Sequence, residues 1–153
     1  MPPSSARLRG PARRDAPAGL AGAGRAATLP AQLDRWLVEA EPLREFTAMV
    51  LSTVSADGRP SSRNVLLKGS DAEGLVFFTN LASRKATQAV GQSWVSLCLP
   101  WSELARQVCV EGTVTPVSRA EAQEYWETRP RGSQLGAWAS RQSSLTSRAE
   151  LET

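Results

Sequence analysis

Three groups of polar residues in this sequence have the types and spacing that phosphate binding requires. In the first, Ser83, Arg84 and Lys85 follow a short apolar stretch and open a predicted helix, whose free backbone N–H groups favour an anion. The alternative is an exposed first turn whose charges only face solvent. Cations at this end of a helix are unfavourable unless an anion compensates them, so a phosphate site is as good an interpretation as a solvated turn.

A second group lies at the end of another predicted helix, where Tyr125 and Arg129 are four residues apart and share one face. With Ser133 they supply a phenol, a guanidinium fork and a hydroxyl, which suit the oxygens of a second phosphate. An ordinary exposed pair stays possible, because spacing alone does not exclude it. Gln107 and Gln142 are neutral amides that could hydrogen-bond the edge of a heterocycle.

The third group is the stretch from Arg63 to Lys68, which places a cation at each end of an apolar strand. Charges that flank a buried strand and face solvent are the simpler interpretation. Period-two alternation puts the two side chains on opposite faces of the strand. One ligand could contact both only if the strand bends, or if the ligand lies at a boundary between subunits.

The sequence contains no histidine, which excludes Ser-His-Asp and Cys-His catalysis, HExxH zinc sites and most transition-metal sites. We therefore expect no bound metal. Any chemistry needs a carboxylate or lysine mechanism, or a bound organic cofactor. Cys98 and Cys109 lie in apolar runs without CxxC spacing, so we expect small core residues of a reduced, cytoplasmic protein rather than nucleophiles.

The length of 153 residues suits one domain, and no stretch approaches the roughly 20 apolar residues of a membrane helix. The net charge of +3 is concentrated at the start of the chain, where residues 1–30 hold five arginines and one aspartate. This part is rich in Ala, Pro and Gly. We expect a flexible basic arm over residues 1–30, with no role in nucleic-acid binding, and a folded domain over residues 31–153.

The apolar pattern predicts an α+β domain. Helices are expected over residues 33–45, from Ser83 to about Val90, from Ser118 to a stop at Pro130, and from Ser147 onward. Strands are expected over residues 46–54, 61–68, 75–79, 93–101 and 106–117, with a hairpin turn at Asp57-Gly58 and a possible bulge at Glu111-Gly112. Five short strands, mostly in hairpins, predict a mostly antiparallel barrel rather than a doubly wound sheet.

Taken in order, four stretches resemble motifs of the pyridoxamine 5'-phosphate oxidase family: RNVLLKG, GLVFFTNLASRK, RQVCVEGTV and YWETRPRGSQLGAWASRQSS. The resemblance runs from about Leu33 to the end of the chain. It implies an FMN-binding split β-barrel with peripheral helices, which forms a homodimer and binds FMN in a cleft between subunits. Such a cleft would let both faces of the strand from Arg63 to Lys68 serve one site.

The resemblance also implies the binding residues. FMN would be bound by Arg63, Asn64, Val65, Leu66, Leu67, Lys68, Phe78, Thr79, Arg84, Lys85, Gln107, Gln142 and Ser143. The substrate, pyridoxamine or pyridoxine 5'-phosphate, would be bound by Lys68, Tyr125, Arg129 and Ser133. No catalytic residue is assigned, because FMN supplies the redox chemistry. The implied reaction transfers a hydride from C4' of the substrate to FMN, which O2 reoxidises, and yields pyridoxal 5'-phosphate.

Three departures from the family pattern accompany the resemblance. Phe78 stands where a tyrosine is common, and the stretch 13–16 ends in alanine where the family has Arg-Arg-acid-Tyr. The family pattern also continues past Thr153 into further strands, so we expect the C-terminal part of the family domain to be missing. Two alternatives stay open: a non-catalytic protein that binds FMN or pyridoxal phosphate, and a split-barrel flavin reductase with a different substrate.

Overall fold

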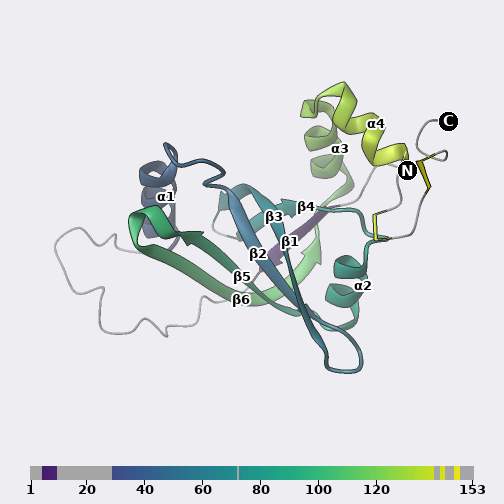
Figure 1. Cartoon of the computed structure of the whole chain (residues 1–153), viewed down its shortest axis with the longest axis horizontal. Coiled ribbons are helices and arrows are strands. Elements are labelled where there is room, and N and C mark those ends of the chain that lie inside the picture. The colour runs from purple at the N-terminus through teal and green to yellow at the C-terminus, as the bar shows by residue number, and fades with distance from the viewer. Residues whose placement is uncertain (1–4, 10–28, 72, 140–141, 144–146, 149–153) are drawn as a thin grey trace.

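The computed structural model describes residues 5–9, 29–71, 73–139, 142–143 and 147–148. Within this part, six strands form a closed antiparallel barrel in the order β1-β4-β3-β2-β5-β6 (Figure 1). The strands are β1 (Ser5–Arg9), β2 (Ala48–Val54), β3 (Pro60–Asp71), β4 (Gly74–Phe78), β5 (Trp94–Trp101) and β6 (Arg106–Pro116). The helices are α1 (Leu29–Ala40), α2 (Arg84–Gly91), α3 (Arg119–Thr128) and α4 (Arg131–Ala139), with a 3₁₀ turn at Ser102–Leu104. The predicted mostly antiparallel α+β barrel is confirmed.

The barrel interior is filled by alternate residues of β2, β3 and β5, as period-two patterning requires, together with the buried stretch of β4. Met49 and Leu51 on β2, Phe77 on β4, and Leu97 and Leu99 on β5 are almost completely buried. On β2 and β5, the neighbours of these residues in sequence point to the outer face and are half-buried or exposed. The same alternation gives β3 an inner face with Val65 and Leu67 and an outer face with Leu66 and Lys68.

The β2–β3 hairpin turns at the predicted Asp57-Gly58 pair. Gly58 has a φ of 82°, which glycine adopts without strain, and its N–H donates to the carbonyl of Ser55. The prediction of a bulge at Glu111-Gly112 is wrong, because β5 and β6 pair there in one continuous register. The register shift lies instead between Leu67 and Gly69, where β3 pairs with β4.

Residues Ser5–Arg9 form β1, which pairs with β4 on one side and with β6 on the other and so closes the barrel. The expectation of a flexible arm is therefore wrong for these five residues. The arm was inferred from the average composition of residues 1–30, which are rich in alanine, proline and glycine, whereas this stretch (SARLR) contains no glycine or proline. Backbone hydrogen bonds to two neighbouring strands can order such a segment even where its own residues do not strongly favour a strand. Residues 1–4 and 10–28 lie outside the described residues.

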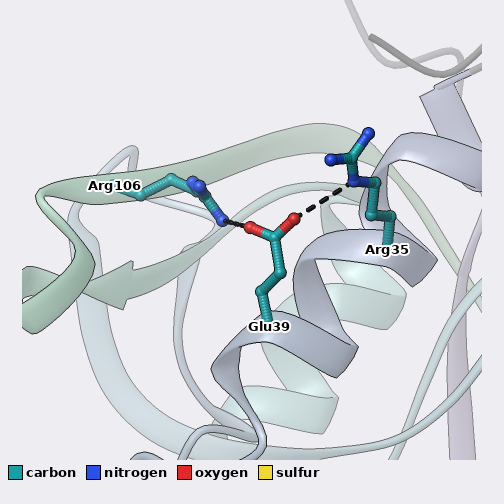
Figure 2. Close-up of polar contacts among 3 residues, drawn as sticks. All are labelled: Arg35, Glu39 and Arg106. Atoms are coloured by element: carbon teal, nitrogen blue, oxygen red, sulfur yellow. Dashed lines mark hydrogen bonds and ion pairs between the residues drawn. The ribbon is translucent and has the colours of Figure 1, made fainter. Parts of the chain in front are cut away.

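Helix α1 packs over the opposite side of the barrel from α2, α3 and α4 (Figure 1). It ends at Ala40 rather than near Glu45, because Pro42 cannot continue the helix. Its Glu39 accepts from Arg35 at 3.1 Å and from Arg106 of β6 at 2.8 Å, as Figure 2 shows. The hydrogen bond from Arg106 is the main cause that lowers the pKa of Glu39. This contact fixes α1 to the barrel away from the candidate site.

Helix α3 begins as predicted: the Ser118 side chain accepts from the backbone N–H of Glu121 at 3.1 Å, and Pro130 follows the last turn. Helix α4 was not predicted, since Gly132 and Gly136 are poor helix formers. The helix predicted from Ser147 falls mostly outside the described residues. None of the described helices is long and apolar enough to cross a membrane.

The two cysteines are not core residues, which corrects the sequence-based expectation. Cys98 and Cys109 are direct partners across β5 and β6, and both side chains lie on the outer face of the barrel. Cys98 is half-buried and Cys109 is exposed. Their apolar neighbours in sequence misled the prediction, because the alternation of each strand sends those neighbours inward and the cysteines outward.

Candidate functional site

Two adjoining cavities lie between β3, the end of β4, α2 and the α3–α4 pair. Each has a volume of about 480 Å³. They share Asn64, Lys85 and Gln142 in their linings, so they form one continuous site with two compartments. Figure 1 shows α2 and the α3–α4 pair on the same side of the barrel. The site is therefore built by elements that are far apart in sequence.

The first cavity gathers three cations, Arg63 from β3 and Arg84 and Lys85 from the start of α2. Burial lowers the pKa of Lys85, and the charge of Arg63 lowers it further. Burial likewise lowers the pKa of Arg63, with a second contribution from Arg84. Within the described part of the chain, none of the three forms an ion pair with a carboxylate. The cavity therefore holds positive charge that an anionic ligand would compensate.

The guanidinium of Arg63 is held by neighbours on β2 and β3. It donates to the carbonyl oxygen of Leu51 at 3.2 Å, to Oγ1 of Thr53 at 2.7 Å and to Oγ of Ser61 at 2.6 Å. Three fixed acceptors restrict the rotamers of this long side chain. Arg63 is thus a preorganised group at the wall of the first cavity.

Ser83 stands at the N-cap of α2, as predicted, but its side chain makes no capping hydrogen bond. It is completely buried, and its Oγ accepts from Nζ of Lys85 at 3.5 Å. Lys85 also donates to Oγ1 of Thr79 at 3.2 Å. The two hydroxyls hold the ammonium group, and Ser83 leaves the first turn of α2 without a side-chain cap.

The side chain of Gln142 links the C-terminal part of the chain to the end of β4, beside the first cavity. Its Oε1 accepts from Oγ1 of Thr79 at 3.3 Å and from the backbone N–H of Asn80 at 3.4 Å. Gln142 and Ser143 line the first cavity beside the cations. Residues 63 positions apart in sequence therefore meet at the end of β4.

The second cavity brings together the four residues predicted to bind the substrate: Lys68, Tyr125, Arg129 and Ser133. Tyr125 stacks on Phe78, and Nζ of Lys68 lies 6.0 Å from the centre of its ring. The guanidinium of Arg129 donates to the carbonyl oxygen of Ser133 at 3.2 Å. Two cations, a phenol and a hydroxyl thus surround one compartment that is also lined by aromatic rings.

The predicted opposite orientation of Arg63 and Lys68 is confirmed. Arg63 shares the inward face of β3 with Val65 and Leu67, whereas Lys68 shares the outward face with Leu66. The structure resolves the difficulty that this posed, because each cation lines a different compartment. Asn64 lies between the two compartments.

Two predicted site residues line neither cavity in the described structure. Leu67 is buried in the barrel core, where it packs with other apolar side chains. Gln107 lies on the exposed outer face of β6, and β2 and β5 stand between that strand and β3. Its role stays a prediction.

Sequence reasoning missed several residues that line the second cavity: Asn80, Ala122, Trp126, Gly136 and Ala137. Most of these belong to the faces of α3 and α4 turned toward the barrel. The sequence carried no signal for α4, so its contribution could not be placed. Among the described residues, no group of three or more Cys, Asp or Glu side chains could hold a metal ion.

The antiparallel barrel with its peripheral helices is a split β-barrel, and two solved structures share this fold. PhzG from Burkholderia lata, solved with tetrahydrophenazine-1-carboxylic acid, superposes with a TM-score of 0.77 at 33% identity, over 80% of this chain and 62% of that one. A pyridoxamine 5'-phosphate oxidase-related, FMN-binding protein from Nostoc punctiforme shares the fold, with a TM-score of 0.66 at 22% identity, over 84% and 73% of the two chains.

The sequence relatives are more specific. The family model described as pyridoxamine 5'-phosphate oxidase matches residues 38–152. Relatives named pyridoxine/pyridoxamine 5'-phosphate oxidase include one from Rubrobacter xylanophilus, 54% identical over 79% of this chain, and one from Acidothermus cellulolyticus, 51% identical over 88%. The chain belongs to the pyridoxamine 5'-phosphate oxidase family. It spans 57% and 61% of the lengths of these two relatives.

Proposed function

We propose that the chain binds FMN in the first cavity and takes part in the oxidation of pyridoxamine or pyridoxine 5'-phosphate to pyridoxal 5'-phosphate by O2. The cluster of Arg63, Arg84 and Lys85 carries this proposal, because three cations without a carboxylate partner in the described part of the chain suit a phosphate. Membership of the oxidase family supports FMN as the ligand that brings it.

The residues present fit such a cofactor. The three cations would hold its phosphate, with Gln142 and Ser143 beside them, as the lining of the first cavity indicates. The flavin ring would be held by residues of β3 and the end of β4 that line the adjoining cavity: Asn64, Val65, Leu66, Lys68, Phe78 and Thr79. Bound FMN would supply the hydride acceptor and the reaction with O2, and the chain would supply binding and orientation.

The second cavity supports a phosphorylated substrate rather than a small unphosphorylated one. Lys68 and Arg129 provide positive charge, and Tyr125 and Ser133 provide hydroxyl groups around the same compartment. Charge-assisted hydrogen bonds of this kind favour a phosphate. Two adjoining anion sites are what a phosphorylated substrate beside a phosphorylated cofactor requires. A flavin reductase would have no use for the second site.

We propose that the working unit is a homodimer in which a second copy supplies Gln107. Within one chain, Gln107 lies on β6, which is three strands from β3 in either direction around the closed barrel and so stands on the opposite side of it. Its side chain projects from the outer face of β6, so it lines neither cavity of its own chain. Analytical ultracentrifugation is expected to show a dimer, and FMN titration is expected to show weaker binding in Gln107→Ala. A monomeric protein, or an unchanged FMN affinity in Gln107→Ala, would contradict this proposal.

One experiment tests the proposed reaction. The purified chain is mixed with FMN and pyridoxine 5'-phosphate under air, and flavin binding and pyridoxal 5'-phosphate formation are followed by their absorbance. The proposal expects bound flavin and product. Bound flavin without product would contradict the oxidase activity and leave a flavin-binding protein. Unbound flavin would contradict the whole proposal.

A further inference from the structure

The side-chain amide of Gln88 joins α2 to the barrel at two points. Its Oε1 accepts from Oγ1 of Thr53 at 2.6 Å and from Oγ of Ser61 at 3.0 Å. Both hydroxyls also accept from the guanidinium of Arg63, at 2.7 Å and 2.6 Å. One amide oxygen therefore closes a network of four side chains that ends on a cation of the first cavity.

The direction of these hydrogen bonds gives Gln88 control over Arg63. A hydroxyl has one proton, and Thr53 and Ser61 both donate theirs to the amide oxygen of Gln88. Their lone pairs are then left to accept from Arg63. Without the amide oxygen, each hydroxyl would lose the acceptor for its proton and could rotate, so its lone pairs would no longer be fixed toward the guanidinium.

The position of Gln88 on α2 adds a second constraint. Arg84 and Lys85 lie one turn before Gln88 on the same helix, and both line the first cavity. Gln88 thus links the strand that carries one cation to the helix that carries the other two. Three of the five N–H groups of Arg63 are used by Leu51, Thr53 and Ser61, which leaves two that a ligand in the cavity can accept.

We propose that Gln88 is a positioning residue of the phosphate site: through Thr53 and Ser61 it orients the guanidinium of Arg63 toward the phosphate of FMN. This inference rests on the proposed function of the first cavity. It concerns a half-buried residue that lines neither cavity and so acts only through its neighbours.

The test is a double-mutant cycle on FMN affinity, measured by quenching of flavin fluorescence. Gln88→Leu, Arg63→Ala and the double variant are compared with the wild-type chain, and thermal melting reports whether each variant is folded. Gln88→Leu is expected to weaken FMN binding by about three- to thirtyfold, which lies within the range for coupled residues of one network. In the Arg63→Ala background the same change is expected to alter affinity by less than about twofold.

Gln92→Leu is the matched control, because it makes the same substitution at an exposed glutamine that follows α2. It is expected to leave FMN affinity unchanged. If Gln88→Leu does not fold, Ser61→Ala enters the same cycle, with a smaller loss expected because only one of the two hydroxyls is removed.

Two results would overturn the inference. One is an unchanged FMN affinity in Gln88→Leu. The other is a full loss that persists in the Arg63→Ala background, since Gln88 would then only anchor α2. A wild-type chain that binds no FMN would instead refute the proposed function itself, and that result is seen before any substitution is made.

Discussion

The rings of Phe78 and Tyr125 lie face to face, with centroids 3.6 Å apart and planes within 4° of parallel. Phe78 ends β4 and Tyr125 lies on α3, so this contact fixes the helix to the barrel. Both rings line the second cavity. The stack therefore sets where the Tyr125 hydroxyl stands relative to Lys68, whose Nζ lies 6.0 Å from the tyrosine ring.

Tyr125→Phe keeps the stacked ring and removes only the hydroxyl. We expect the affinity for pyridoxal 5'-phosphate to fall by about tenfold, because a hydrogen bond to a charged phosphate is lost. FMN affinity should not change, since Tyr125 does not line the first cavity. Titrations with each ligand check this, and an equal loss of both affinities would show that the hydroxyl does not act on the substrate phosphate.

Arg84→Ala removes an exposed cation from the first turn of α2. A charge-assisted hydrogen bond contributes about 1.5 to 3 kcal/mol, so FMN affinity should fall by roughly ten- to a hundredfold. Arg44→Ala is the control, because Arg44 is an exposed arginine on the turn after α1. Fluorescence titration measures both variants. Similar affinities for the two variants would refute a phosphate contact by Arg84.

Lys85→Met should make the ligand-free protein more stable and weaken FMN binding. Lys85 is 8% exposed, and burial beside Arg63 lowers its pKa, so folding disfavours its charged form. Methionine avoids this cost, and we expect the free energy of unfolding to rise by about 1 kcal/mol. Thermal melting without ligand checks this expectation. A lower melting temperature in Lys85→Met would contradict it.

The same pKa shift predicts a pH dependence. The folded pKa of Lys85 lies below the unfolded one. Between these two pKa values, the unfolded chain therefore binds more protons than the folded chain does at the same pH. The stability of the ligand-free wild-type chain should therefore increase with pH there, relative to Lys85→Met. Urea unfolding of both proteins at several alkaline pH values measures the difference, and a constant difference would contradict the shift.

Cys98 should react slowly with alkylating reagents at neutral pH. Burial raises the pKa of Cys98 to about 11, with a further contribution from its hydrogen bond with Cys109. The thiolate is the reactive form, so alkylation by iodoacetamide should quicken about tenfold for each pH unit up to that value. Peptide mass mapping should find Cys109 labelled first. Rapid labelling of Cys98 at pH 7 would contradict this account.

Much of the barrel could be predicted from the sequence, because its elements are specified locally. The strands expected over residues 46–54 and 93–101, the Asp57-Gly58 turn and the Ser118 cap are all specified over a few residues, and the structure confirms each. The clustering of Arg63, Arg84 and Lys85 needed more than local patterns. It followed from the family resemblance, which carried the spatial information that spacing alone lacks.

The remaining features depend on partners distant in sequence. β1 is ordered by pairing with β4 and β6, and average composition cannot reveal this. The outward orientation of Cys98 depends on the register of β5, which an apolar run does not define. The Gln88 network joins three elements through hydroxyl groups that look like ordinary strand residues. Such contacts become visible only once the chain is folded.

The central claim is that the first cavity recognises the phosphate of FMN, and a comparison of FMN with riboflavin tests it most directly. The two ligands share the flavin ring and differ by the phosphate alone. Three cations at the site should make FMN bind at least about a hundredfold more tightly than riboflavin, measured by fluorescence titration of the same protein sample. Equal affinities for FMN and riboflavin would contradict the claim.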